Sequence, residues 1–487
     1  MNYSMKLINA ASASNYPNNL RMTRLGVVVI AFVAMLPISA NEAHALPSFA
    51  RQTGTSCGAC HTDFPQLTPF GRRFKLGGYT MGGGENSADY KKTFGGNQWV
   101  PPISVMGIFG YSQTATSQPV TDELSPGNNY FAPIEGSVFY GGAITNELGA
   151  FVQATYEAGA NATEGSKFFL DNTDVRYAKS GSIFGANAIF GITLHNNPTV
   201  QDVWNTTPAW GFPFVSSEFA PTPAAATVIE GNFAGKVLGV GAYTFINDMF
   251  YLEATAYKGM DRRFQNTLGV WDASPVMDRV SPYVRAAVEP HWGNHWLMVG
   301  AFWFSTSANP SYADPVAFPT SGSDKFVDVG IDSQYQYMGK NFVLTLRGSY
   351  IHEKQTLDAT FANFGSDNPT NTLNSFKAQA SYAWNTDAPG NKWIFTGGYF
   401  NTWGSTDFLW HPDSVTTGSP NSDGWIAEIA WFPFAMSKPS LWPYFNARVG
   451  LQYIWYNKFN GTSTNYDGAG RNASDNNTLF AYVWFAL

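Results

Sequence analysis

From about Pro102 onward, apolar and polar residues alternate along the chain with a period of two, and turn-forming residues separate the alternating segments. In one segment Leu344 and Leu346 share a face, and Arg347 lies on the opposite face. A period of two is typical of β-strands, whose successive side chains point to opposite sides. Apolar-out and polar-in alternation over about ten residues indicates a membrane-spanning strand around a polar lumen. A soluble antiparallel sandwich alternates in the same way, so alternation alone leaves both folds open.

The lengths of the connections discriminate between these two folds. Tight turns, such as residues 145–147 and 293–294, alternate along the chain with long connections, such as residues 196–234 and 403–422. Short turns at one end and long loops at the other, on an even number of strands, are typical of an outer-membrane barrel. We therefore expect an all-β fold, a 16-stranded antiparallel transmembrane β-barrel over residues 99–487. The expected strands lie near residues 103–114, 131–144, 148–157, 168–179, 187–195, 235–245, 249–258, 281–292, 295–306, 325–337, 341–354, 372–384, 392–402, 423–432, 442–458 and 477–487.

The composition and the last strand support this fold. Charged residues make up 13% of the chain and aromatic residues 16%, whereas globular proteins have about 25% charged residues. An outer face that meets membrane lipid accounts for that composition. The apolar face that runs from Leu479 to Leu487 resembles a barrel-insertion signal. The net charge of the chain is -7, and the sequence contains no basic patch of the kind that binds nucleic acid. We therefore expect no nucleic-acid partner.

The first 45 residues have the features of an export signal. Arg21 and Arg24 precede an apolar run at residues 25–38, and small residues at 43–45 offer a cleavage site. We therefore expect a signal peptide over residues 1–45 and a mature chain that begins near Leu46.

Both cysteines of the chain stand in the run Cys57-Gly58-Ala59-Cys60-His61. Two thiols at this spacing can add to the two vinyl groups of one haem, and the adjacent imidazole then lies within reach of the iron. A thiol redox pair, a disulfide or half of a zinc site are the alternatives. A thiol redox pair requires a βαβ context, and a zinc site requires two further Cys or His ligands nearby. The sequence after His61 shows neither the βαβ context nor the two ligands. The motif therefore predicts one covalently attached haem c, held by Cys57, Cys60 and His61.

A segment of about 50 residues, 46–98, lies between this motif and the barrel. A piece this short can hardly build a large core of its own. We therefore expect a small monohaem cytochrome domain that takes its missing apolar contacts from the haem or from the inside of a barrel. Met81 is the candidate for the distal iron ligand, and the alternative is that Met81 packs under the plug. A Met/His pair raises the potential of a haem.

The connection at residues 196–234 is long and rich in aromatic residues. Connections of this length in a compact fold are often functional. Two interpretations stay open. The connection folds over or into the barrel mouth and covers the haem, or it is an ordinary surface loop.

The N-terminal segment resembles the fused monohaem cytochrome-porins of iron(II)-oxidising bacteria. The residues that carry this resemblance flank the haem motif, and they are residues 49–54, Phe64, Pro65, Leu67, Phe70, Gly71, Arg72, Phe74, Lys75 and residues 78–81. The resemblance implies an N-terminal cytochrome that occupies or caps a 16-stranded outer-membrane barrel. It also implies an oxidoreductase that takes electrons from extracellular Fe(II) and passes them to a periplasmic carrier, a cytochrome or a copper protein.

Three hypotheses follow from these observations. The first is an outer-membrane electron conduit from extracellular Fe(II) through a single haem. The second is a diffusion porin whose haem-bearing plug senses redox state or gates the pore. The third is a soluble or peripheral periplasmic cytochrome with an all-β binding domain. The alternation of loop lengths and the terminal strand disfavour it.

Overall fold

The computed structural model of the chain describes residues 46–82, 102–119, 127–157, 167–198, 202–206, 215–230, 233–270, 276–310, 322–384, 392–434 and 444–487. The expected signal peptide and the expected domain boundary between residues 98 and 99 lie outside the described residues. Residues Glu42–Leu487 form one compact unit. No helix within the described ranges has the length and apolar character of a membrane span.

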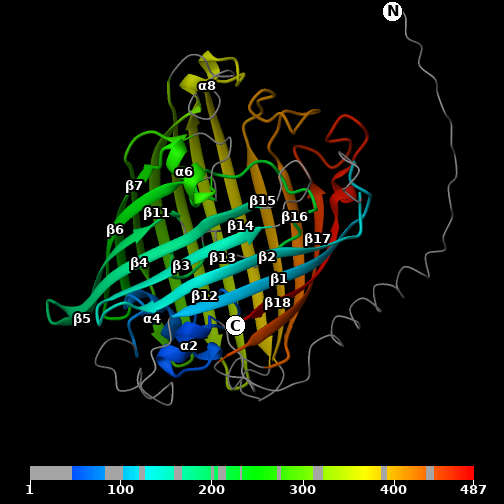
Figure 1. Ribbon diagram of the computed structural model, residues 1–487. Helices are drawn as coiled ribbons and strands as arrows, with labels where there is room; N and C mark the ends of the chain where they lie inside the picture. Colours follow the sequence, from blue (N-terminus) through cyan, green and yellow to red (C-terminus); the bar gives the residue numbers. More distant parts are fainter. Residues whose placement is uncertain are drawn as a thin grey trace, which may run out of the picture. The chain divides into compact units, whose positions relative to one another are not determined.

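The described strands form one closed antiparallel sheet (Figure 1). Strand β1 pairs with both β2 and β18, which joins the two ends of the sheet. The short strands β8 and β10 lie on either side of β9 in the sequence, and all three pair with the same neighbour, β11. We therefore count β8, β9 and β10 as one strand, which gives a barrel of 16 strands. The strands are β1 (Ile103–Thr114), β2 (Tyr130–Ala143), β3 (Leu148–Glu157), β4 (Lys167–Ile183), β5 (Ala186–His195), β6 (Val237–Ile246), β7 (Phe250–Gly259), β8 (Val276–Met277), β9 (Ser281–Val288), β10 (His291–Trp292), β11 (His295–Asn309), β12 (Asp324–Met338), β13 (Phe342–Thr356), β14 (Thr370–Trp384), β15 (Lys392–Gly404), β16 (Ser422–Phe432), β17 (Asn446–Lys458) and β18 (Thr478–Ala486).

The predicted 16-stranded barrel is thus confirmed, and every expected strand lies within a few residues of an observed one. The strand that extends furthest beyond its predicted end is β4, which continues to Ile183 where the sequence predicts an end near residue 179. The connection to β5 is consequently a tight turn, because Phe184 and Gly185 both have positive φ angles, 49° and 82°. Two such residues form the hairpin turn whose twist matches that of the flanking strands.

The two faces of the wall differ in polarity as the alternation predicts. Outward side chains such as Ile331 and Leu346 are 58% and 41% exposed, whereas Asp328 and Arg347 point inward and are 0% and 8% exposed. The inner face therefore carries the charged groups, and the outer face carries apolar side chains that lipid can cover. The protein is accordingly a membrane-spanning barrel of the type found in the outer membranes of Gram-negative bacteria.

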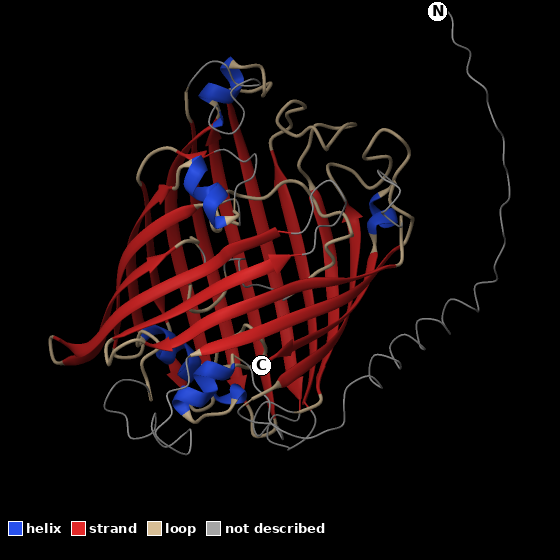
Figure 2. Cartoon of the chain, in the orientation of Figure 1, coloured by secondary structure: helices blue, strands red, loops and turns tan. Residues whose placement is uncertain are grey.

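Short helices occupy both ends of the barrel (Figure 2). Three of them, α2 (Pro47–Thr53), α3 (Cys57–Cys60) and α4 (Pro69–Leu76), belong to the N-terminal segment at residues 46–82, which we call the plug. The long connections carry α6 (Arg262–Leu268), α8 (Asp358–Ala362) and the 3₁₀ helix η2 (Ala473–Asn476). Figure 1 shows the plug helices at the end of the barrel where the short turns lie. Short turns face the periplasm in barrels of this type, so the plug fills the periplasmic mouth.

Hydrogen bonds and ion pairs attach the plug to the barrel wall around its circumference. Arg72 forms a buried ion pair with Glu289, which follows β9. Arg51 Nη2 donates to the carbonyl of Ile103 in β1 at 2.5 Å, and Tyr243 of β6 donates to the carbonyl of Leu76 at 2.6 Å. The plug therefore completes its core against the barrel, as its small size requires.

Candidate cofactor site at the periplasmic mouth

The cysteine motif forms a single helical turn that α4 holds in place. The amide of His61 donates to the carbonyl of Cys57 at 2.8 Å, which closes the turn. Thr68 caps α4, and its hydroxyl also donates to the carbonyl of Ala59 at 2.5 Å. Gly71 of α4 lies directly on this turn, because a Cβ atom at Gly71 would stand 2.3 Å from the carbonyl oxygen of Cys60. Glycine is therefore the residue that allows α3 and α4 to approach so closely.

A cavity of about 1140 Å³, partly open to solvent, lies beside this turn. Residues of the plug and of the barrel wall both line it. The plug contributes Leu46, Phe49, Cys57, Cys60, His61, Phe64, Phe74 and Tyr79, and the wall contributes Met106, Phe139, Phe151, Trp484 and Ala486.

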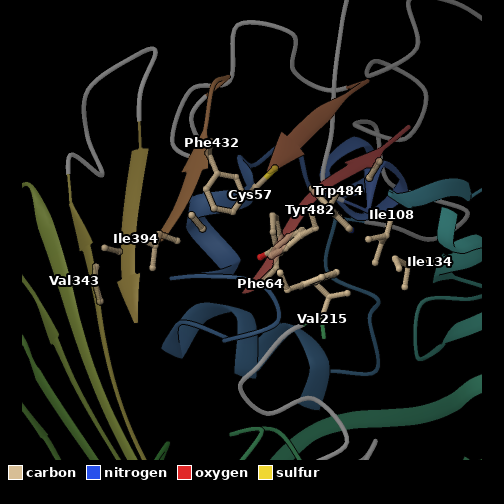
Figure 3. Packing of buried hydrophobic residues seen from close by; sticks show 14 residues of the cluster. Cys57, Phe64, Ile108, Ile134, Val215, Val343, Ile394, Phe432, Tyr482 and Trp484 are labelled. Carbon is tan, nitrogen blue, oxygen red and sulfur yellow. The ribbon is translucent and has the colours of Figure 1, made fainter. Parts of the chain in front are cut away.

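Aromatic rings surround the motif on the wall side (Figure 3). The centroid of the Phe64 ring lies 4.7 Å from that of the His61 ring and 5.1 Å from that of Trp484. Cys57 is 4% exposed and belongs to the same apolar cluster as Phe64 and Trp484. The motif therefore faces an apolar space that plug and wall build together.

His61 has the protonation state of a metal ligand. Burial, and then the positive charge of Lys392, lower the pKa of His61 to about 4, and the carbonyl groups of Gln66 and Pro65 oppose this shift only in part. The imidazole is therefore neutral at neutral pH, which is the form that binds metals. Its Nδ1 atom is buried and forms no hydrogen bond.

The two thiols are not joined in a disulfide, and their surroundings disfavour a thiol redox pair. Burial, and then the neighbouring Cys57, raise the pKa of Cys60 to about 12. A redox-active cysteine needs a lowered pKa, because the thiolate is the reactive form. Among the described residues there is also no group of three or more His, Cys, Asp or Glu placed to hold a metal ion. The arrangement suits a cofactor that the two thiols bind covalently and that His61 contacts through its ring.

Met81, the candidate distal ligand, lies away from this cavity. Its side chain is 42% exposed, and its carbonyl accepts a hydrogen bond from Gln52 Nε2 at 3.0 Å. Met81 is not among the lining residues, whereas Met106 of β1 is. Ligation of iron by Met81 stays a prediction.

The long connection after β5 folds into the barrel, as one of the two open interpretations expects. Trp204 is 1% exposed, and its Nε1 donates to Glu289 at 2.8 Å. Asn205 Nδ2 donates to the carbonyl of Pro65 at 3.0 Å, and Arg347 of β13 donates to the carbonyl of Asn205 at 2.5 Å. This connection therefore bridges the plug and the far wall. Residues 199–201 and 207–214 of it lie outside the described residues.

Asn205 also lies between two cavities. It lines the cavity beside the cysteine motif and a second one of about 1080 Å³ on the lumen side. The second cavity is bordered by Arg347, Lys377 and Tyr399, which belong to β13, β14 and β15. Asn205 thus forms a partition between the lumen cavity and the plug cavity.

Sequence reasoning missed two residues of this site, namely Met106 and Arg448. For Met106 the sequence contained a signal, since residues 104, 106 and 108 share the inward parity of β1. Arg448 forms an ion pair with Asp63 of the plug. The alternation along β17 predicts that Arg448 points inward, but it does not predict that Asp63 is the partner. Asn205 lies in the connection at residues 196–234, which the sequence singles out by its length and its aromatic residues.

No protein-family model matches the chain, and no curated protein matches it. Solved structures of outer-membrane channels are similar to it in part. OmpF of Salmonella typhi in complex with daunomycin has a TM-score of 0.45 at 12% identity, covering 79% of this chain and 97% of its own. The anion-selective porin of Comamonas acidovorans has a TM-score of 0.41 at 11% identity, covering 79% and 98%. The outer-membrane channel DcaP of Acinetobacter baumannii has a TM-score of 0.40 at 10% identity, covering 79% and 96%. The barrel assignment rests on the strand pairing described above.

Proposed function

We propose that the protein is an outer-membrane c-type cytochrome that accepts electrons from extracellular Fe(II). It passes them through one haem to a periplasmic carrier, a cytochrome or a copper protein. The observation that carries this proposal is the cavity in which Cys57, Cys60 and His61 meet the apolar barrel wall. The choice of Fe(II) as the donor rests on the resemblance of residues 49–81 to the cytochrome-porins of iron(II)-oxidising bacteria.

The residues present fit a covalently bound haem. Two unlinked thiols border the cavity, and the imidazole beside them is neutral at neutral pH and has a buried nitrogen without a hydrogen bond. Phe64, Phe139 and Trp484 supply the apolar and aromatic walls that a porphyrin needs. When bound, the haem supplies a centre that takes up and gives back one electron.

The position of the plug supports transfer between two compartments. The cysteine motif lies at the periplasmic mouth, within reach of soluble carriers on that side. On the other side, Asn205 forms the partition between the plug cavity and the lumen cavity. In this proposal a small donor enters from the extracellular end and approaches as far as this partition. Each Fe²⁺ ion that gives up one electron leaves as Fe³⁺ without entering the cell.

A second candidate function is that of a diffusion porin whose haem-bearing plug senses redox state or gates the pore. The closed 16-stranded barrel, whose inner face carries polar and charged side chains, favours it. In this case the haem would not turn over, and solute flux would depend on the oxidation state of the plug.

The test uses the purified holoprotein reconstituted in liposomes that enclose an oxidised c-type cytochrome. Fe(II) added outside should reduce first the haem of the protein and then the enclosed cytochrome, as followed by their absorption. The variant Cys57→Ala/Cys60→Ala, which cannot bind haem covalently, is the matched control and should transfer no electrons. A haem that stays oxidised with Fe(II), together with solute flux that changes with a chemical reductant, would establish the gated porin instead.

A further inference from the structure

We propose that Met106 of β1 supplies the sixth ligand of the haem iron, so that the barrel wall rather than the plug completes the coordination. This inference rests on the proposed function, because it requires the haem at Cys57, Cys60 and His61. It replaces Met81, which the sequence alone suggests.

The side chains around the cavity leave few candidates for a distal ligand. Tyr79 donates its hydroxyl proton to Asp174 at 2.6 Å, and the Nζ atom of Lys75 donates to the carbonyl of Asp202 at 3.2 Å. The side-chain amide of Asn205 is held by the carbonyl of Pro65. Among the described residues that line the cavity, Met106 is the one thioether, and thioethers are established haem ligands.

Met106 stands where the two apolar walls of the cavity meet. It packs against the cluster that contains Cys57, Phe64 and Trp484, and also against the cluster that contains Phe74 and Phe139. The register of β1 directs it inward, since Met106 lies between the buried Ser104 and Ile108 along the same face. Its side chain is thus held at the space that separates the cysteine motif from the wall.

The neighbouring backbone fixes this position. Met106 pairs with Ala486 of β18 on one side and with Ser137 of β2 on the other, so its Cα atom belongs to the rigid sheet. Met81, by contrast, follows α4 outside the cavity and is 42% exposed. A ligand held by paired strands stays in place in both oxidation states. A Met/His pair also raises the potential of a haem, as acceptance of electrons from Fe(II) requires.

The test compares Met106→Leu with Met81→Leu in the full-length holoprotein. Leucine conserves most of the volume of methionine, and such exchanges are tolerated well in packed interiors. Three quantities are measured: the iron–thioether charge-transfer band of the ferric protein, the reduction potential, and carbon monoxide binding by the ferrous protein. Met106→Leu should lose the band, lower the potential and bind carbon monoxide more readily, whereas Met81→Leu should behave like the unchanged protein.

The outcomes separate this inference from the proposed function. A band that persists in Met106→Leu, or one that Met81→Leu removes, overturns the role of Met106 and leaves the proposed function standing. Absence of covalent haem from the unchanged protein overturns both. If Met106→Leu does not assemble, Met106→His provides the second variant, because histidine can also bind iron; a spectrum identical to that of the unchanged protein would then contradict ligation by Met106.

Discussion

The Nη1 atom of Arg448 in β17 lies 2.8 Å from the Oδ1 atom of Asp63, two residues after the histidine of the cysteine motif. The same guanidinium also pairs with Glu428 of β16 and donates to the carbonyl of Phe64 at 3.1 Å. Both partners of the Arg448–Asp63 pair are almost fully buried, at 1% and 4% side-chain exposure. This ion pair therefore fixes the loop after the motif to the barrel wall.

Arg448→Met should release the plug from the wall. It leaves the carboxylates of Asp63 and Glu428 buried without their cation, and breaking a buried pair in this way costs about 3–5 kcal/mol. We expect a lower free energy of unfolding, measured by denaturant titration in detergent, and faster proteolysis at the plug. Lys458→Met at the exposed extracellular end of the same strand is the control and should change neither quantity. Equal effects of the two variants would contradict an anchoring role for Arg448.

Gly71→Ala should impair the packing of α4 on the cysteine motif. The new Cβ atom would lie 2.3 Å from the carbonyl oxygen of Cys60, and backbone must move to make room. Overpacking of this kind costs about 1–3 kcal/mol, so we expect less covalently bound haem per protein, measured by haem staining. Gly136→Ala in β2 is the matched control, since no atom lies within 4 Å of its added Cβ. Full haem content in Gly71→Ala would show that the two helices separate easily.

Trp204→Ala should detach the connection at residues 202–206 from the plug. The ring of Trp204 is 1% exposed and its centroid lies 5.2 Å from that of Tyr251, and the replacement of a buried aromatic residue by alanine costs about 3–5 kcal/mol. We expect lower stability and a larger single-channel conductance in planar bilayers, because the partition at Asn205 loses its support. Trp292→Ala, at a site that is 50% exposed, should leave the conductance unchanged. An unaltered conductance in Trp204→Ala would mean that this connection does not restrict the lumen.

The extracellular loops should resist acid because of Asp407. Burial opposes ionisation of Asp407, but hydrogen bonds from the amide of Asp367, from Ser366 and Asn371 and from the amide of Trp410 outweigh it and lower the pKa to about 2. The carboxylate therefore stabilises the folded loops above its unfolded pKa, and this contribution is lost as the pH falls from about 4 towards 2.

Asp407→Asn replaces a carboxylate that accepts these hydrogen bonds by an amide, whose NH₂ group cannot accept them. The free energy of unfolding should therefore fall by roughly 1–3 kcal/mol at pH 7. The difference between the variant and the unchanged protein should shrink at pH 2, as measured by thermal unfolding in detergent. Asp413→Asn changes an exposed carboxylate of the same loop and serves as the control. A stability difference that is the same at pH 7 and at pH 2 would argue against an ionised Asp407.

Much of the barrel could be predicted from the sequence, because the alternation of apolar and polar residues within each strand shows which side chains point inward and which point outward. Asp328 and Arg347 point into the lumen as their alternation requires, and the tight turn at residues 293–294 appears where expected. The site could be predicted only in part, since the cysteine motif predicts a covalent attachment but does not say which residues of the barrel wall lie beside it. Asp63 and Arg448 are 385 positions apart along the chain, and no local pattern records that they meet. The inward parity of Met106 was likewise readable, but its position beside Cys57 depends on how the plug enters the barrel.

The cavity wall has a consequence for how the protein is assembled. Met106 comes from the first strand of the barrel, and Trp484 and Ala486 come from the last, so the wall lies across the seam at which β1 and β18 pair. Before the two ends of the sheet have joined, Trp484 and Ala486 do not lie beside Met106, and this wall is incomplete. If the plug carries the haem proposed above, attachment in the periplasm would act on an open plug, and closure of the seam in the outer membrane would be the step that encloses the haem. A barrel whose first and last strands have not joined would then leave the proposed haem exposed on that side.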